Sequence, residues 1–190
     1  MKKEKIIEEL EKHYAEKLYV RLTRKKGGFE GISTGFVVDK SDEFILLQES
    51  DEFRILGYQI IPIRTIKHVR YNKNDKTYGR ILKDEMLLER VRIKHKVDLT
   101  NWTSITKDIK KTGLTIISEC EHPKLRYFCI GHLQRINKKS ISIRYFNAQG
   151  ILDKENTKHK FEDITKLSFD DHYANVFSKY VKEKAVANKK

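Results

Sequence analysis

The chain has 190 residues and carries 40 Lys and Arg against 27 Asp and Glu, a net charge of +13. This length fits one ordinary domain or two small ones, and a hydrophobic content of 38% supports a core, which excludes disorder along the whole chain. Residues 1–17 are charged throughout and nowhere do about 18 apolar residues run together, so we expect no signal peptide, no membrane span and a cytoplasmic location. Two cysteines exclude a disulfide framework, and the positive charge favours polyanionic partners.

The first 73 residues predict a helix followed by five strands. Residues 2–17 place Ile6, Ile7, Leu10 and Tyr14 on one face at helical spacing. Short runs rich in β-branched and aromatic residues follow, separated by polar or glycine-containing clusters, and each run predicts a strand. The predicted strands are 17–25, 33–40, 43–50, 53–63 and 65–72.

Residues 74–98 form a connection that is too long for a hairpin and too apolar for a free linker. Within it, residues 81–91 predict a helix with Ile81, Leu82, Met86 and Leu88 available for packing. From residue 64 to residue 96 there are 11 Lys and Arg against 4 Asp and Glu, so this stretch holds more than half of the net charge. This concentration of positive charge makes the stretch a candidate binding surface for a polyanion.

A strand over residues 91–96 would align three basic side chains on one face, where they match a row of phosphates. Tyrosines nearby in the sequence would stack on bases. The alternative is a solvated edge strand that its lysines protect from aggregation. The predicted nucleic-acid-binding residues are Arg64, Lys67, Arg70, Tyr71, Tyr78, Arg92, Lys94 and Lys96.

The chain then repeats itself. A second helix is predicted over residues 99–114, with Trp102, Ile105 and Ile109 on one face, Thr100 as its cap and Gly113 as its stop. Regular offsets between apolar positions of the two halves indicate a tandem duplication, and chance agreement between two β-rich segments is the alternative. An offset of 96 relates Leu18 to Leu114, Val20 to Ile116, Gly35 to Gly131, Val37 to Leu133, Ile45 to Ile141 and Leu47 to Ile143, and an offset of 98 relates Ile63 to Phe161, Ile66 to Ile164, Val69 to Leu167 and Tyr71 to Phe169.

Each unit has a helix, a second strand that contains glycine, a third strand "EFILLQE" or "SISIRYF", and a terminal "IPIRTIKHVRY" or "KFEDITKLSF". In this order the units resemble the Sm-like class of small SH3-type β-barrels. The resemblance implies a mainly β (α+β) chain with two tandem five-stranded SH3/Sm-like β-barrels, each preceded by a helix. Such barrels often bind RNA or proteins and often assemble, but this chain departs from the ring-forming members in its two units and long connection.

The resemblance and the repeat together predict four segments. They are a helix plus first barrel (1–73), a basic and partly helical connection (74–98), a helix plus second barrel (99–178) and a basic tail (179–190). In each barrel Gly35 or Gly131 would relieve crowding where a long strand bends. We expect the residues of the inward parity to be buried: Val20, Val37, Ile45, Leu47, Ile66, Ile116, Leu133, Ile141, Ile143 and Ile164.

No motif for catalysis or for a cofactor is present. Gly27 and Gly28 lack the lysine and the further glycine of a phosphate loop and predict a hairpin turn. The sharpest metal-like set is Cys120, His122, Cys129 and His132, but its spacing does not match structural zinc sites, and strand parity turns His132 away from Cys129. We expect two buried thiols that pack as small hydrophobes, no metal, no cofactor and no enzymatic activity.

The function predicted from the sequence is non-enzymatic binding of nucleic acid, single-stranded RNA rather than DNA, because no motif for duplex DNA is visible and small barrels favour single strands. The alternative is a protein-interaction or scaffold module in which the charge serves solubility. A contiguous basic surface with aromatic residues favours the first function, and an even scatter of charge favours the second. Residues 1–96 carry a charge of +6 and residues 97–190 carry +7, and this evenness counts against a single dedicated basic domain. The sequence leaves the oligomeric state open.

Overall fold

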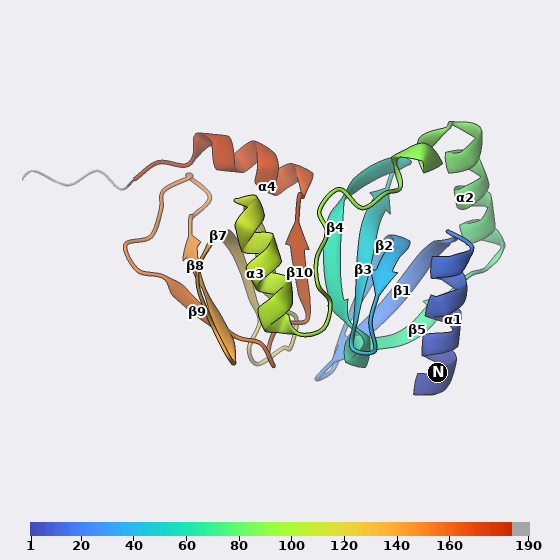
Figure 1. The fold of residues 1–190 in the computed structure, drawn as a ribbon, viewed down its shortest axis with the longest axis horizontal. Coiled ribbons are helices and arrows are strands. Elements are labelled where there is room, and N and C mark those ends of the chain that lie inside the picture. Colours follow the sequence, from blue (N-terminus) through green and yellow to red (C-terminus); the bar gives the residue numbers. More distant parts are fainter. Residues whose placement is uncertain (184–190) are drawn as a thin grey trace, which may run out of the picture.

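The computed structural model describes residues 1–183, which form one open, antiparallel sheet of ten strands with helices packed against it (Figure 1). The order of strands across the sheet is β5-β1-β2-β3-β4-β10-β6-β7-β8-β9. The prediction of a mainly β, α+β chain is confirmed. Two closed barrels are not confirmed, because the ladder of each half stays open and the halves share a sheet through β4 and β10.

The first half and the start of the connection contain eight elements in chain order. They are α1 (Lys3–Ala15), β1 (Tyr19–Lys26), β2 (Phe29–Lys40), β3 (Phe44–Asp51), β4 (Arg54–Pro62), the 3₁₀ turn η1 (Ile63–Thr65), β5 (Ile66–Arg70) and α2 (Lys73–Asp84). A second 3₁₀ turn follows, and the second half then repeats the pattern of helix and strands. These elements are η2 (Leu87–Arg90), α3 (Trp102–Thr112), β6 (Ile116–Cys120), β7 (Tyr127–Asn137), β8 (Ser140–Tyr145), β9 (Thr157–Lys160), β10 (Lys166–Phe169), α4 (His172–Phe177) and η3 (Ser178–Tyr180).

The duplication is confirmed at the level of strand register. Val20 pairs with Gly35 between β1 and β2, and Ile116 pairs with Gly131 between β6 and β7. The pairing of β2 with β3 and that of β7 with β8 also agree. In both, the register shifts by one residue at equivalent positions, after Val37 and after Leu133. In each half the fifth strand returns to pair with the first, as β5 does with β1 and β10 does with β6. Two copies of one five-stranded unit therefore lie side by side.

Gly35 and Gly131 occupy the same place because the next strand passes too close for a side chain. A Cβ on Gly35 would overlap the carbonyl oxygen of Gln48, and a Cβ on Gly131 would overlap that of Arg144. Gly35 also has a φ of +151°, a backbone conformation that L side chains rarely adopt. The glycines thus permit close packing of β2 on β3 and of β7 on β8.

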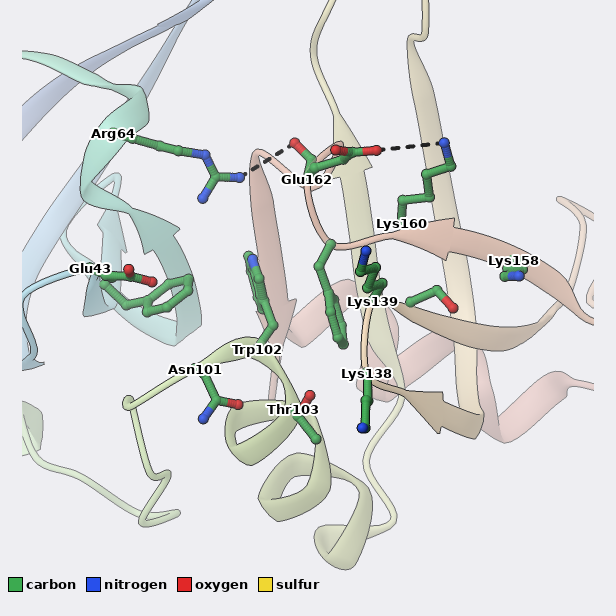
Figure 2. A pocket seen from close by; sticks show the side chains of 13 residues that line it. Glu43, Arg64, Asn101, Trp102, Thr103, Lys138, Lys139, Lys158, Lys160 and Glu162 are labelled. Carbon is green, nitrogen blue, oxygen red and sulfur yellow. Dashed lines mark hydrogen bonds and ion pairs between the residues drawn. The ribbon is translucent and has the colours of Figure 1, made fainter.

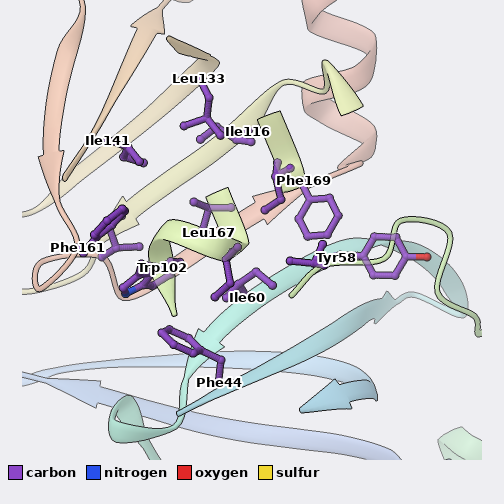
Figure 3. Packing of buried hydrophobic residues seen from close by; sticks show 14 of the residues in the cluster. Phe44, Tyr58, Ile60, Trp102, Ile116, Leu133, Ile141, Phe161, Leu167 and Phe169 are labelled. Carbon is purple, nitrogen blue, oxygen red and sulfur yellow. The ribbon is translucent and has the colours of Figure 1, made fainter. Parts of the chain in front are cut away.

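All ten residues of the predicted inward parity are buried. One cluster lies in the first half and packs Ile6 and Leu10 of α1 on strands β1 to β5. A second, larger cluster joins the halves, since it contains Phe44 and Ile60 of the first half together with residues of α3 and of strands β6, β7, β8 and β10 (Figure 3). The continuous sheet and this shared core fix the position of the two units relative to each other.

The two long helices that open the halves form as expected, with changes in detail. Trp102, Ile105 and Ile109 of α3 are buried, and Gly113 ends the helix in a left-handed conformation. The cap is the neighbouring Asn101, whose side chain accepts the hydrogen bond from the amide of Ser104, and not Thr100. On α1 the residues buried are Ile6, Leu10 and His13, whereas Ile7 and Tyr14 are exposed because the sheet lies slightly to one side of the predicted face.

The prediction of a strand over residues 91–96 is wrong. The segment is irregular because side chains of the first half hold its backbone in place of a partner strand. The amide of Arg92 donates to Gln48 at 2.9 Å, and the hydroxyl of Tyr58 accepts from the amide of Lys94 at 3.0 Å. Met86, expected to pack, is 70% exposed. No helix within the described residues is long and apolar enough to cross a membrane.

Candidate functional site

A cleft of about 830 Å³ lies where the two halves meet (Figure 2). One wall comes from the first half, from the turn that enters β3 and from η1, and the N-terminal end of α3 lies below it. The opposite wall is formed by the turn between β7 and β8 and by β9 with the residues after it. The basic side chains that line the cleft are Arg64, Lys138, Lys139, Lys158 and Lys160.

Local structure explains why the four lysines gather here. Lys138 and Lys139 are the two residues of the hairpin turn between β7 and β8, so both side chains stand clear of the sheet. Lys158 and Lys160 flank His159 on β9, and side chains alternate between the two faces of a strand. Because His159 is buried, its two neighbours are exposed toward the cleft.

The floor of the cleft is aromatic. Phe44 and Trp102 pack edge to face with ring centroids 4.9 Å apart, and Trp102 and Phe161 lie nearly parallel, at 5.9 Å and 11°. All three rings are at least nine-tenths buried and belong to the core that joins the halves (Figure 3). The indole Nε1–H of Trp102 is also buried and has no acceptor among the described residues. An unpaired buried donor is costly, and this N–H keeps a hydrogen-bonding capacity that the described residues do not use.

Positive charge dominates the cleft. Five cationic side chains face two carboxylates, those of Glu43 and Glu162. Lys160 pairs with Glu162 at 3.5 Å, and Arg64 donates to the carbonyl oxygen of Glu162 at 3.4 Å. Within residues 1–183, Lys138, Lys139 and Lys158 have no carboxylate within 4.0 Å. Their ammonium groups are available to an anionic ligand.

The corresponding place in the first half is smaller and has no excess of positive charge. The turn residues Asp42 and Glu43 occupy the positions of Lys138 and Lys139, and Ile6 of α1 occupies that of Trp102 under the 96-residue offset. A hollow of about 180 Å³ next to this turn is lined by Lys3, Asp42, Glu43, Ile63 and Arg64. Within the described part of the chain, the Lys-Lys turn and the tryptophan are thus features of the second unit that the first unit does not repeat.

The site residues predicted from the sequence lie in different places, and Arg64 alone among them lines the cleft. Lys67 is exposed on β5, where its carbonyl oxygen accepts a hydrogen bond from the N-terminal amine of Met1 at 3.1 Å. Arg70 forms a bidentate ion pair with Asp75, and this hydrogen bonding raises the pKa of Arg70. The charge of Arg70 is thus already compensated within the fold.

The two predicted tyrosines pack against other rings. Tyr78 stacks on Phe53 with centroids 4.6 Å apart, and its hydroxyl accepts from the amide of Phe53 at 2.8 Å. Tyr71 meets His13 edge to face at 5.0 Å, and the ammonium of Lys76 lies 5.4 Å from its ring centroid. Both tyrosines therefore have intramolecular partners on at least one side.

The basic residues of the connection lie near the junction of the halves but outside the cleft. Lys94 pairs with Asp170 of the second half at 3.2 Å, while Arg92 and Lys96 are exposed. Lys96 lines a separate hollow that also contains two carboxylates, those of Asp98 and Asp108. Together with the sites of Lys67 and Arg70, these placements distribute the predicted residues over several elements.

The cleft was missed because its parts are distant in the sequence. Trp102 was interpreted as a core residue of its helix, which it is, and the lysines stand in unremarkable turn and strand segments. A usable signal was present, since the Lys-Lys turn leads into β8 and the lysines at alternate positions lie on β9, which pairs with β8. The sequence did not indicate that Arg64 of the first half lies in the same cleft as the lysines of the second half.

No metal centre is apparent: the described residues contain no group of three or more His, Cys, Asp and Glu placed to hold an ion. Cys120 and Cys129 are buried free thiols, as predicted. Burial raises the pKa of Cys129 to about 12, so this thiol stays protonated and unreactive at neutral pH.

Comparison with known proteins finds no matching family model, no matching curated protein and no matching solved structure. The geometry of the cleft is therefore the main evidence on function.

Proposed function

We propose that the chain binds single-stranded nucleic acid, RNA in particular, in the cleft between its two halves. The observation that carries this proposal is the group of four lysines and Arg64 around an aromatic floor. Phosphates of a nucleic acid strand pair with such cations and release condensed counterions, which supplies most of the affinity in sequence-independent binding. A net charge of +13 adds long-range attraction for the same ligand.

The shape of the cleft favours a single strand over a duplex. Duplex DNA is commonly read by a helix that enters the major groove, whereas α3 presents only its N-terminal end here and packs its side on the sheet. A hollow of about 830 Å³ accommodates a few nucleotides of an unpaired strand, whose bases then lie over apolar surface. The resemblance of each unit to the Sm-like class, proposed from the sequence, agrees with this choice.

The proposal is tested by titrating the protein with short labelled oligonucleotides of RNA and DNA at several salt concentrations. Trp102 is the single tryptophan of the chain and lies in the cleft, so its fluorescence should change on binding. Changing Lys138, Lys139 and Lys158 to Ala should weaken binding and flatten the log-log salt slope by about two units, because each phosphate contact on a single strand contributes roughly −0.7.

The matched comparison is the triple variant Arg92→Ala, Lys94→Ala and Lys96→Ala, which removes the same charge from the connection. The cleft proposal expects a smaller change in slope for this variant than for the lysine variant. If the connection variant flattens the slope and the lysine variant does not, the binding surface is the one predicted from the sequence. A loss of about 1 to 3 kcal/mol on changing Tyr71 to Ala would support that surface too.

Absence of binding to every oligonucleotide at low salt would overturn the proposal. The protein-interaction module is then the remaining candidate, and the even distribution of charge between the halves, +6 and +7, is what favours it.

A further inference from the structure

The N-terminal end of α3 opens into the cleft with unused hydrogen-bond donors. Asn101 caps the helix by accepting from the amide of Ser104 at 3.0 Å. The amides of Trp102 and Thr103 have no acceptor among the described residues, and both residues line the cleft. Free amides and the helix dipole make such an end attractive to anions.

The indole of Trp102 gives a second and independent indication of a ligand. Its side chain is 7% exposed, and its Nε1–H is buried without an acceptor in the described part of the chain. In Figure 2 the indole nitrogen points toward the side of the cleft that Arg64 and Glu162 form. An anion seated there would accept this hydrogen bond and would lie next to the guanidinium of Arg64.

Arg64 has donors left for such an anion. Its one hydrogen bond to the described chain is to the carbonyl oxygen of Glu162, at 3.4 Å, and no carboxylate lies within 4.0 Å of it. An arginine fork binds phosphate with good geometry, more so than a lysine does. Two amides, an indole and a guanidinium therefore belong to residues that line the same cleft, and the indole nitrogen points to the side of Arg64 (Figure 2).

We infer that this group of donors is a seat for a terminal phosphate monoester of the bound strand, an inference that rests on the proposed function. A phosphodiester inside a strand carries one charge and offers two free oxygens. A terminal monoester carries about −1.5 to −2 charges at pH 7 and offers three acceptor oxygens, which matches the number of donors better. A terminal phosphate is attached to the strand on one side only, so it can enter a buried site that has no exit for the rest of the strand.

The absence of an indole donor at the equivalent place of the first half supports a specific role for Trp102. Ile6 stands in the place of Trp102 and has no donor, and the nearby turn carries Asp42 and Glu43. The repeat fold alone therefore does not require an indole donor beside an arginine at this position.

The test compares short unstructured RNA oligonucleotides that carry a 5′-phosphate, a 3′-phosphate or hydroxyls at both ends, as unlabelled competitors of one labelled strand. One phosphorylated form should bind about tenfold tighter than the hydroxyl form, the size expected of hydrogen bonds to a charged group. The two phosphorylated forms distinguish which end is held. The preference should fall below about pH 6, where the monoester loses its second charge.

Trp102→Phe keeps a ring on the floor and removes the donor, and it should weaken binding of the phosphorylated form by a larger factor than binding of the hydroxyl form, so that the preference between the two falls. Arg64→Gln, at an exposed residue whose replacement leaves the core intact, should do the same and serves if the first variant fails to fold. Equal affinity for all three oligonucleotides, or equal weakening of all three in both variants, would overturn the inference and leave the proposed function standing. Absence of any binding would overturn both.

Discussion

At the scale of single residues, both units require a glycine at the same position of the second strand, because a side chain there would clash with the third strand. A Cβ at Gly131 would overlap the carbonyl oxygen of Arg144, which the ladder between β7 and β8 holds in place. Backbone in the middle of a sheet moves less easily than the end of a flexible side chain. Gly79 on α2 differs, because a Cβ there would lie 3.6 Å from the Cβ of Tyr19, an ordinary contact.

We therefore expect opposite effects from two alanine substitutions. Gly131→Ala should lower the free energy of unfolding by about 1 to 3 kcal/mol, as overpacking does. Gly79→Ala should raise it by up to about 1 kcal/mol, because alanine is the better residue inside a helix. Urea denaturation followed by circular dichroism measures both, and a neutral Gly131→Ala would mean that the strands separate at little cost.

At the scale of elements, β9 shows how strongly the second half curls. His159 on β9 places Nδ1 3.1 Å from the hydroxyl of Ser118 on β6, although these strands are not neighbours in the sheet. The ring of Tyr127 on β7 lies 4.0 Å from that of His159. Leu22 and Ile61 occupy the equivalent positions of the first half, so the same fold there contains an apolar pair. The polar contact is thus a property of the second copy and not of the fold.

The buried His159 should make stability depend on pH. Burial lowers its pKa to about 4, and Asp163 opposes this effect in part. As the pH falls below about 6.5, the unfolded chain binds a proton that the folded chain does not, so the free energy of unfolding should decrease down to about pH 4 and then level off. His159→Ile, which copies the first half, should make this decrease smaller.

The dependence should not vanish in that variant, because burial also lowers the pKa of His13. Replacing the exposed His68 by Ile is the control and should leave the pH dependence as it is. Midpoints of urea denaturation between pH 7 and pH 4 provide the measurement. If the denaturation midpoint of His159→Ile changes between pH 7 and pH 4 as much as that of the unmodified protein, groups other than His159 cause the pH dependence.

At the scale of the whole molecule, the two units share one sheet and one core. Strands β4 and β10 pair across the junction, and the larger core contains residues of both halves. On the same junction the buried Arg24 of β1 forms a bidentate ion pair with Glu121 and donates to Ser33 at 3.0 Å. Separation of the units would expose this core and leave buried charges without partners.

We expect a single unfolding transition for the chain. The fluorescence of Trp102, which reports on the junction, and far-ultraviolet circular dichroism, which reports on all strands, should give the same midpoint in urea. Phe44→Ala should lower the free energy of unfolding by about 3 to 5 kcal/mol, because Phe44 contributes to the core of both halves. Both midpoints should therefore shift together. Two separate transitions would instead indicate two independent domains.

Much of this architecture was predictable because short-range patterns encode it. Alternation of apolar residues placed Ile45 and Ile141 correctly in the interior, and helical spacing did the same for Ile105 and Ile109. The 96-residue offset predicted equivalent registers around Gly35 and Gly131, which the strand pairs confirm. Of the candidate cleft, one cation, Arg64, was identified in advance.

Local pattern determined which residues form each strand, which face they turn inward and that the unit occurs twice, because the period of a strand or helix is set by the backbone itself. It did not determine how the copies meet, because β4 and β10 are separated by more than a hundred residues and any free strand edge can accept a partner. Only the folded sheet brings Arg64, the start of α3 and the lysines of the β8–β9 region around one cleft. The candidate site is therefore a product of the junction between the repeats, and neither repeat alone contains it.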